Sequence, residues 1–385
     1  MDFTLPEELQ MLKNNLRRYV DKEMIPVERE TTNDQEELDP AWQKKFQEGM
    51  KSLGLWMYDI PEEYGGQGLG ILARCIIWEE LARTIALPAR HSEITGPSVR
   101  AILFDLPEDL KKRYLYPVLE GKKHACFGQT EPDAGSDPGS MRTVAVRDGD
   151  HYVINGTKRF ITGAAHADFI QLMAATDRSK GSRGGISCFL IDMDTPGIKI
   201  TARFKTMMGD RPCEIHFDNV RVPKAQMVGG EGDGFKFGQK WLGVGRVHHG
   251  ARALGVAERC LEMASNYAKQ RVTFGQPLSQ RQAIQWMLVD SFVELKAARL
   301  MVWEAACKMD KGEDARNDCY VAKMYADEMA FRVVDRCMQI HGGIALTTDL
   351  PIERMWRQQR SYRITEGATE VMKMVIARHV LKAYP

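Results

Sequence analysis

The chain has 385 residues, of which 44% are hydrophobic and 27% charged, as in an ordinary globular protein and unlike a disordered one. Its 53 lysines and arginines nearly balance its 52 aspartates and glutamates, and the resulting net charge of +1 disfavours nucleic acid as a general partner. No stretch approaches the ~18 uncharged apolar residues that span a bilayer, and no secretory signal is visible at the start, so we expect no membrane partner.

The first third of the sequence has helical periodicity. Thr4 and Glu7 fit a capping box, and apolar residues then follow at three- and four-residue spacing. Two further helices are expected over residues 41–53 and 71–81, where Gly54 ends the first of them. These patterns predict an N-terminal helical domain over residues 1–122.

The middle of the sequence has a different period, with short apolar runs separated by turn formers. Residues 151–158 predict a β-hairpin, because the pair Asn155-Gly156 suits the positive φ angles of a tight turn. Further strands are expected over residues 188–191, 198–200 and 214–217. The sequence therefore predicts a small β domain over residues 123–233.

Long amphipathic helices follow to the end of the chain. Apolar stripes run through residues 254–268, 284–305 and 321–338, and Gly342 with Gly343 provides a stop for the third helix. Several long helices in series predict a C-terminal helical bundle over residues 234–385. The fold class is thus α+β and multi-domain, in the order helical, β, helical.

The eight cysteines do not form a metal or redox motif. No two are closer than Cys307 and Cys319, which excludes a CxxC pair and a zinc ribbon, and no HExxH segment occurs. We expect reduced, mostly buried thiols and no metal. A GxxxxGK[ST] segment is also lacking, so a P-loop is unsupported.

The segment 129–137, QTEPDAGSD, combines small residues, turn formers and hydroxyls at the entry to the β region. Its backbone amides and side-chain oxygens could converge on a polar ring or a phosphate. The same composition is typical of a solvated polar turn, so the segment alone decides nothing.

The segment resembles the TEPGAGSD signature of acyl-CoA dehydrogenases, with Asp133 in place of the first glycine. Four further segments resemble the same family, in its order and spacing and across almost the whole chain: 159–163 (RFITG), 270–275 (QRVTFG), 339–343 (QIHGG) and 366–370 (EGATE). The resemblance implies an N-terminal helical domain, a middle β-barrel-like domain and a C-terminal four-helix bundle.

The resemblance also implies a flavoprotein that oxidises an acyl-CoA thioester to a trans-2-enoyl-CoA. Such a reaction needs a carboxylate against the α-carbon and a flavin that accepts the β-hydrogen as hydride. Glu366 lies where most family members carry the base. Some relatives carry it on a helix at the position of Gly245, which has no carboxylate. Electrons would leave FAD for electron-transfer flavoprotein.

Other roles follow residue by residue from the resemblance. Thr130 is expected at the pyrimidine side of the flavin, Thr162 at its N5 atom, and Ser136 between the flavin and the thioester. Arg246 and Gly367, with Ser136, match substrate contacts. The remaining residues expected to bind FAD are Phe127, Gln129, Phe160, Arg271, Thr273, Phe274, Gln282, Gln339, Gly342, Gly343, Ala368 and Glu370. Several of these bind FAD across a subunit boundary in the family, which implies a homotetramer built as a dimer of dimers.

Three departures from the family bear on the substrate. Thr365 replaces an aromatic residue that often precedes the base, Gly243 replaces an acidic residue that contacts CoA in some relatives, and Ala368 stands where a threonine commonly touches FAD. Our hypothesis is that Thr365, Gly243 and Gly245 widen the acyl pocket for a long, branched or ring-bearing acyl group.

Three alternatives stay open at this point. An acyl-CoA oxidase has the same fold and flavin but passes electrons to oxygen, and its chains are usually longer. A nitroalkane oxidase-like enzyme uses an aspartate base and no CoA, while a non-catalytic scaffold would keep only the fold. The lack of a targeting segment fits a bacterial cytoplasmic enzyme, and a mature chain of an organellar matrix would look the same.

Overall fold

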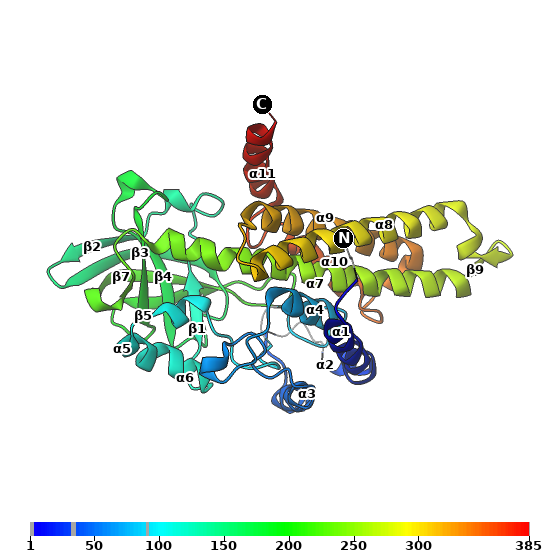
Figure 1. The fold of residues 1–385 in the computed structure, drawn as a ribbon, viewed down its shortest axis with the longest axis horizontal. Helices are drawn as coiled ribbons and strands as arrows, with labels where there is room; N and C mark the ends of the chain where they lie inside the picture. The colour runs from blue at the N-terminus through cyan, green and yellow to red at the C-terminus, as the bar shows by residue number, and fades with distance from the viewer. Residues whose placement is uncertain (1–3, 32–35, 90–91, 385) are drawn as a thin grey trace. The chain divides into compact units, whose positions relative to one another are not determined.

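The computed structural model describes residues 4–31, 36–89 and 92–384. The chain divides into two compact units (Figure 1). The first, here called the helical unit, combines residues 1–89 with residues 243–385, and the second, the β unit, comprises residues 90–242. The predicted order of a helical, a β and a second helical region is confirmed, while the domain limits at residues 122 and 233 stay predictions.

The N-terminal helices confirm two of the predicted segments and correct one cap. They are α1 (Glu7–Tyr19), α2 (Glu28–Thr31), α3 (Pro40–Ser52) and α4 (Ile71–Leu81). The capping box predicted at Thr4 and Glu7 is wrong, because α1 begins at Glu7 and Pro6, which has no side-chain oxygen, is its N-cap residue. A true side-chain cap occurs on α3, where Asp39 accepts a hydrogen bond from the Ala41 amide at 2.9 Å.

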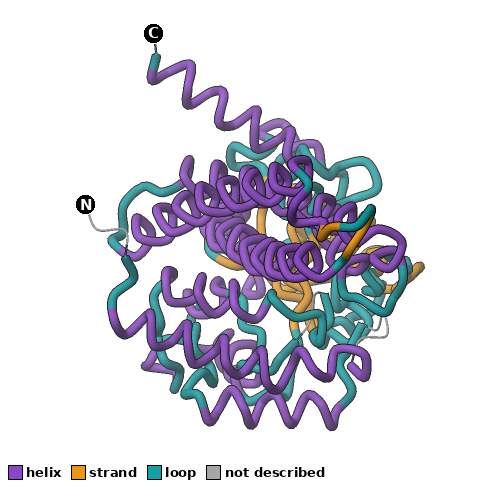
Figure 2. The backbone as a smooth tube through the Cα atoms, turned by 90° about the vertical axis from the view of Figure 1, so that its right-hand side faces the viewer, coloured by secondary structure: helices purple, strands orange, loops and turns teal. Residues whose placement is uncertain are grey.

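The C-terminal helices are α7 (Gly234–Gln270), α8 (Gln282–Asp310), α9 (Arg316–His341), α10 (Ile352–Tyr362) and α11 (Thr369–Ala383). The helical unit's long helices lie alongside one another (Figure 2), with α8, α10 and α11 packed on α9 and α4 packed on α8. Alanines fill much of this core, which lets helix backbones approach closely. A Cβ built on Gly255 of α7 would lie 1.9 Å from the backbone oxygen of Glu79 on α4.

The β unit contains one mixed sheet. Its strands run in the order β6-β7-β3-β2-β4-β5-β8, and β1 pairs with β4 in parallel. Large buried side chains such as Phe169, Phe189 and Phe217 fill its core. The strands are β1 (Ala125–Gly128), β2 (Val144–Asp148), β3 (His151–Ile161), β4 (Phe169–Ala175), β5 (Ile186–Asp192), β6 (Ile198–Arg203), β7 (Cys213–Pro223) and β8 (Met227–Val228), and the short helices α5 (Glu108–Leu110) and α6 (Tyr116–Leu119) precede them.

The hairpin predicted with Asn155-Gly156 as its turn is wrong. Both residues lie inside β3, and the two-residue turn is Gly149-Asp150, between the paired residues Asp148 and His151. Gly156 has a φ of 153° at a shift in register against β7, and a Cβ there would lie 2.6 Å from the Thr143 Cα. Glycine is thus required for a close approach of two backbones. The strands predicted in β5, β6 and β7 are confirmed.

All eight cysteines are free thiols, as predicted, and seven of them are buried, while Cys307 on α8 is half-buried. Over the described ranges, no helix has the length and apolar character that a bilayer span requires.

Candidate active site

Backbone strain marks three of the residues that the family motifs single out. Of the described non-glycine residues, five have a positive φ: Met57, Phe160, Asn219, Phe274 and Glu366. Side chains rarely tolerate this left-handed conformation, and it persists only where the surroundings fix it. Phe160, Phe274 and Glu366 are all predicted site residues, so the strain coincides with the expected chemistry.

Glu366 lies in the loop between α10 and α11, with a φ of 56°. Its Oε2 atom is buried and has no hydrogen-bond partner among the described residues. Across from it, a Cβ built on Gly245 of α7 would lie 3.2 Å from this oxygen. A buried, unpaired carboxylate oxygen is available to accept a proton from a ligand, and Gly245 leaves the space beside it open.

Arg246 adds a buried cation beside this carboxylate. Its residue is 6% exposed, and its guanidinium carbon lies 4.1 Å from the centre of the Tyr320 ring. Burial lowers the pKa of Arg246, and the negative charge of groups around it, including Glu366, opposes that shift. The structure therefore brings the predicted residues Arg246, Glu366 and Gly367 into one cluster, next to Gly245.

A second cluster surrounds the hairpin between α7 and α8, formed by β9 (Val272–Thr273) and β10 (Gln276–Pro277). Phe274 and Gly275 make its turn with φ values of 48° and 78°, and Phe274 is 98% exposed. Arg281 donates to the Thr273 carbonyl at 2.7 Å. The other predicted residues of this cluster, Arg271 and Gln282, are exposed on either side of the hairpin.

The end of α9 joins this second cluster. His341 stacks on Tyr267 of α7 with 4.4 Å between ring centres, and the Tyr267 carbonyl accepts a hydrogen bond from the Arg271 amide at 2.8 Å. Gly342, with a φ of 68°, ends the helix as predicted, and Gln339, Gly342 and Gly343 are exposed there. Two motifs that lie about 70 residues apart in sequence thus meet in one place.

The predicted flavin-ring residues form a third cluster, within the β unit. The Arg159 amide donates to the Thr130 carbonyl at 2.8 Å, which joins the segment after β1 to the end of β3. Phe160 is 56% exposed, and its ring packs edge-on against Phe204 at 5.2 Å. The other members lie in the same two segments: Phe127 on β1, Gln129 and Ser136 after it, and Thr162 directly after β3.

An ion pair that the sequence did not reveal holds this third cluster together. The Lys158 ammonium lies 2.7 Å from Glu131 Oε1, and their side chains are 0% and 3% exposed. Lys158 also donates to the Gln129 carbonyl, while Glu131 accepts from the Thr143 amide, both at 3.0 Å. Burial lowers the pKa of Lys158 to about 8. Burial would raise the pKa of Glu131, but the charge of Lys158 and the hydrogen bonds that Glu131 accepts together outweigh it and lower that pKa.

Lys158→Met is expected to release the segment after β1. The change leaves Glu131 buried without its cation and removes a donor from the Gln129 carbonyl, and breaking a buried pair in this way costs about 3–5 kcal/mol. Urea unfolding should show this loss, and the purified variant should retain less flavin by its 450 nm absorbance. Lys180→Met, which removes an exposed pair with Asp177, is the control. Equal flavin content in all three proteins would contradict the assignment.

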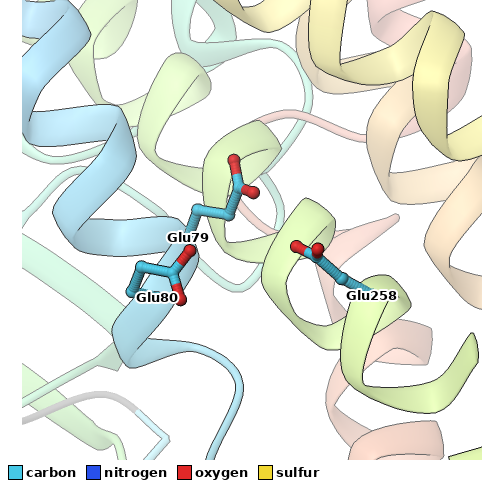
Figure 3. Close-up of side chains that lie close together, drawn as sticks. All are labelled: Glu79, Glu80 and Glu258. Atoms are coloured by element: carbon cyan, nitrogen blue, oxygen red, sulfur yellow. The ribbon is translucent and has the colours of Figure 1, made fainter. Parts of the chain in front are cut away.

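Three carboxylates in the helical unit lie close enough to suggest a metal site (Figure 3). One oxygen each of Glu79, Glu80 and Glu258 lies within 4.8 Å of the others. Cations already surround them: Lys13 pairs with Glu79 at 2.9 Å, Arg17 pairs with Glu80 and Glu258, and Arg299 pairs with Glu79 and Glu258 at 3.0 Å. The group is a salt-bridge network that ties α1, α4, α7 and α8 together.

Family models match nearly the whole chain. They are described as the N-terminal domain (residues 6–122), the middle domain (126–220) and the C-terminal domain (232–381) of acyl-CoA dehydrogenase.

Curated relatives match this chain over nearly all of their length. The human mitochondrial short-chain specific acyl-CoA dehydrogenase is 37% identical over 387 residues, covering 99% of this chain and 92% of its own. The 3-(aryl)acrylate reductase of Clostridium sporogenes is also 37% identical, over 384 residues, covering 98% of this chain and 99% of its own.

Solved structures share the whole fold. Butyryl-CoA dehydrogenase from Megasphaera elsdenii superposes with a TM-score of 0.85 at 33% identity, over 99% of this chain and 100% of that one. A chain from a structure of the electron transferring flavoprotein of Acidaminococcus fermentans gives 0.84 at 34%, with the same coverage. The FAD complex of PigA gives 0.87 at 27%, over 99% of both chains. The chain therefore belongs to the acyl-CoA dehydrogenase family, a family of FAD-dependent oxidoreductases.

Proposed function

We propose that the chain dehydrogenates an acyl-CoA thioester at its Cα–Cβ bond, with Glu366 as the base that removes the α-proton. The observation that carries this proposal is the buried, unpaired Oε2 of Glu366, held by a strained backbone next to Gly245 and Arg246. Among the possible bases of the family, Gly245 offers no carboxylate, so the role falls to Glu366.

The residues present fit FAD. The β unit offers the exposed ring of Phe160 and the hydroxyls of Thr130 and Thr162, groups that suit a flat polar ring. The helical unit offers Arg271, whose guanidinium suits a diphosphate, beside the exposed Phe274. When bound, FAD accepts the hydride from the β-carbon of the thioester.

The chain itself handles the proton and the position of the substrate. Glu366 Oε2 takes the α-proton, since this oxygen is buried and has no hydrogen-bond partner among the described residues. Gly367, with a φ of 102°, turns the backbone directly after the base. The product is a trans-2-enoyl-CoA, and the electrons leave for electron-transfer flavoprotein.

Two relatives are named for reactions that run in opposite directions, and the same site is compatible with both. One is named a dehydrogenase, and another of equal identity is named an acrylate reductase. A group that accepts the α-proton in one direction returns it in the other, so Glu366 serves either direction. The direction depends on the electron partner.

Assembly into a dimer of dimers is also part of the proposal. Helix α8 exposes five large apolar side chains at spacings that fit one face: Trp286, Val289, Phe292, Val293 and Leu300. Beside this face, a cavity of about 860 Å³ between α7 and α8 is lined by Leu261, Phe292 and Trp303, among others. We infer that a second copy of the chain covers this exposed apolar face. Such contact between copies is also what an FAD site that spans two subunits, as in the family, requires.

An anaerobic titration tests the proposed function. The purified protein is mixed with butyryl-CoA, a branched acyl-CoA and a 3-arylpropionyl-CoA while its visible spectrum is recorded. We expect a yellow protein whose 450 nm band is bleached by at least one thioester, and the best one identifies the acyl class.

Two results would contradict parts of the proposal. A yellow protein that no thioester bleaches would leave the family standing but remove the proposed reaction. Sharp preference for butyryl-CoA over every bulkier thioester would contradict a widened acyl pocket at Thr365, Gly243 and Gly245. The role proposed for Gly245 is supported by the short distance of 3.2 Å between a Cβ built at that position and Glu366 Oε2.

A further inference from the structure

A buried lysine lies under the loop that carries Glu366. Lys323 of α9 has a side chain only 1% exposed, and its ammonium donates to the carbonyls of Tyr362 and Gly367, both at 3.0 Å. In the chain, these two carbonyls stand on either side of Glu366. One ammonium therefore bridges the two ends of the segment 362–367.

The charge of this lysine is balanced inside the core. Asp327, one helical turn along α9, lies 2.9 Å from the Lys323 ammonium and is likewise 1% exposed. Burial raises the pKa of Asp327 to about 6, so the carboxylate is still ionised at neutral pH. Replacing a buried ion pair by apolar residues of similar volume is often neutral or stabilising in proteins. The pair therefore calls for a reason other than packing, and the two bound carbonyls supply one.

A neighbouring residue of α9 closes the same loop from outside. Glu328 Oε1 accepts hydrogen bonds from Arg363 Nε and Thr369 Oγ1, each at 2.7 Å. The Thr369 amide also donates to the Arg363 carbonyl at 3.0 Å. The segment between α10 and α11 is thus closed into a small ring, with Lys323 bound to two of its carbonyls.

Inside this ring, Glu366 has a φ of 56°. A non-glycine residue keeps such a strained conformation only where the surrounding contacts fix it. A relaxed backbone would turn its carboxylate away from Gly245 and Arg246. We propose that Lys323 is a positioning residue for the base, fixing the carbonyls of Tyr362 and Gly367 so that the Glu366 carboxylate meets the α-proton. This inference rests on the proposed function and adds to it the residue that aims the base.

The double variant Lys323→Met/Asp327→Leu tests the inference without leaving an unpaired buried charge. We expect it to bind FAD and thioester, with the thioester Kd changed less than about 3-fold, while flavin reduction at saturating thioester slows ~10–100-fold. The isotope effect of an α-deuterated thioester on this rate should also rise, because proton removal becomes more limiting. A purely structural residue would lower stability without separating rate from binding.

A control variant and the wild type distinguish failure of the proposed function from failure of the role proposed for Lys323. Lys13→Met removes a lysine that pairs with the buried Glu79 on α4, and its reduction rate should stay within about 2-fold of the wild type. If the wild type itself is not bleached by thioesters, the proposed function fails. If the wild type is bleached and the double variant reacts at the same rate, or loses rate and binding equally, the role of Lys323 is wrong. If the apolar pair prevents folding, Lys323→Met/Asp327→Asn gives the same comparison, because methionine cannot donate to the two carbonyls and the neutral amide leaves no unpaired charge.

Discussion

Glu366→Gln is expected to lower the rate of flavin reduction by at least ~10³-fold while FAD and thioester still bind. The amide keeps the size and position of the side chain but cannot take the α-proton, so the loss falls on the chemical step. Stopped-flow spectroscopy at 450 nm under anaerobic conditions measures the rate, and the spectral shift on adding a non-oxidisable thioether analogue measures binding.

The control for this experiment lies on the preceding helix. Glu353→Gln makes the same chemical change on α10, where Glu353 pairs with Arg357 at 2.7 Å, and its rate should stay within about 2-fold of the wild type. A Glu366 variant that reduces its flavin at a near-normal rate would require another base. Such a result would also contradict the proposal that Lys323 positions the base, because Glu366 would then not be the base.

Arg17→Met is expected to destabilise the helical unit by about 3–5 kcal/mol. Arg17 donates to both oxygens of Glu80, at 2.5 and 2.8 Å, and lies 3.0 Å from Glu258. Glu80 is fully buried, so the variant would leave its charge inside the core without its main partner. A loss of this size is a large fraction of the stability of an ordinary domain and should be plain in urea unfolding.

The pH dependence of the free energy of unfolding is a second test of the salt-bridge network around Glu80 and Glu258. Burial opposes ionisation of Glu258, but the charges of Arg299, Arg17 and Lys13, with the hydrogen bond from Arg17, together outweigh it and hold its pKa at about 2, below the ordinary 4.5. A carboxyl with a lowered folded-state pKa contributes stability above pH 4.5, and this contribution is lost as the pH falls towards 2. Arg17→Met should flatten the decline, because Glu258 then titrates nearer its ordinary range.

An exposed pair serves as the comparison for the buried one. Arg29 and Asp349 lie 3.9 Å apart with side chains 74% and 63% exposed, and Arg29→Met should change stability by less than about 1 kcal/mol. If both arginine variants were equally stable, the network around Glu80 would not be holding α1 to α4.

Periodicity was sufficient to predict the order of the elements, and it failed where tertiary contacts compete with a local signal. The helix over residues 71–81 has the predicted limits because its apolar pattern and the following turn agree. Asn155-Gly156 carries a strong turn signal, yet the pairing of β3 with β7 keeps both residues in a strand. Sequence spacing contains no information on such pairing.

The candidate site divides in the same way. The base, the exposed ring residues and the FAD-binding segments lie in short motifs that can be recognised one by one. The roles of Lys158 and Lys323 could not be recognised in this way, because the backbone carbonyls that they bind lie 29 to 44 residues away in sequence. A lysine in a pattern of apolar residues was the one available signal, and it does not say which carbonyls the ammonium binds.

The distribution of thiols leaves one position at which the native protein can be labelled. Of the eight cysteines, seven are buried and Cys307 alone is half-buried, on α8. Burial raises the pKa of the Cys307 thiol, so a maleimide or iodoacetamide dye would react slowly at neutral pH and faster in mildly alkaline buffer. The wild-type chain therefore carries a single attachment point for a fluorophore, with no cysteine to remove, and complete labelling of all eight reports unfolding.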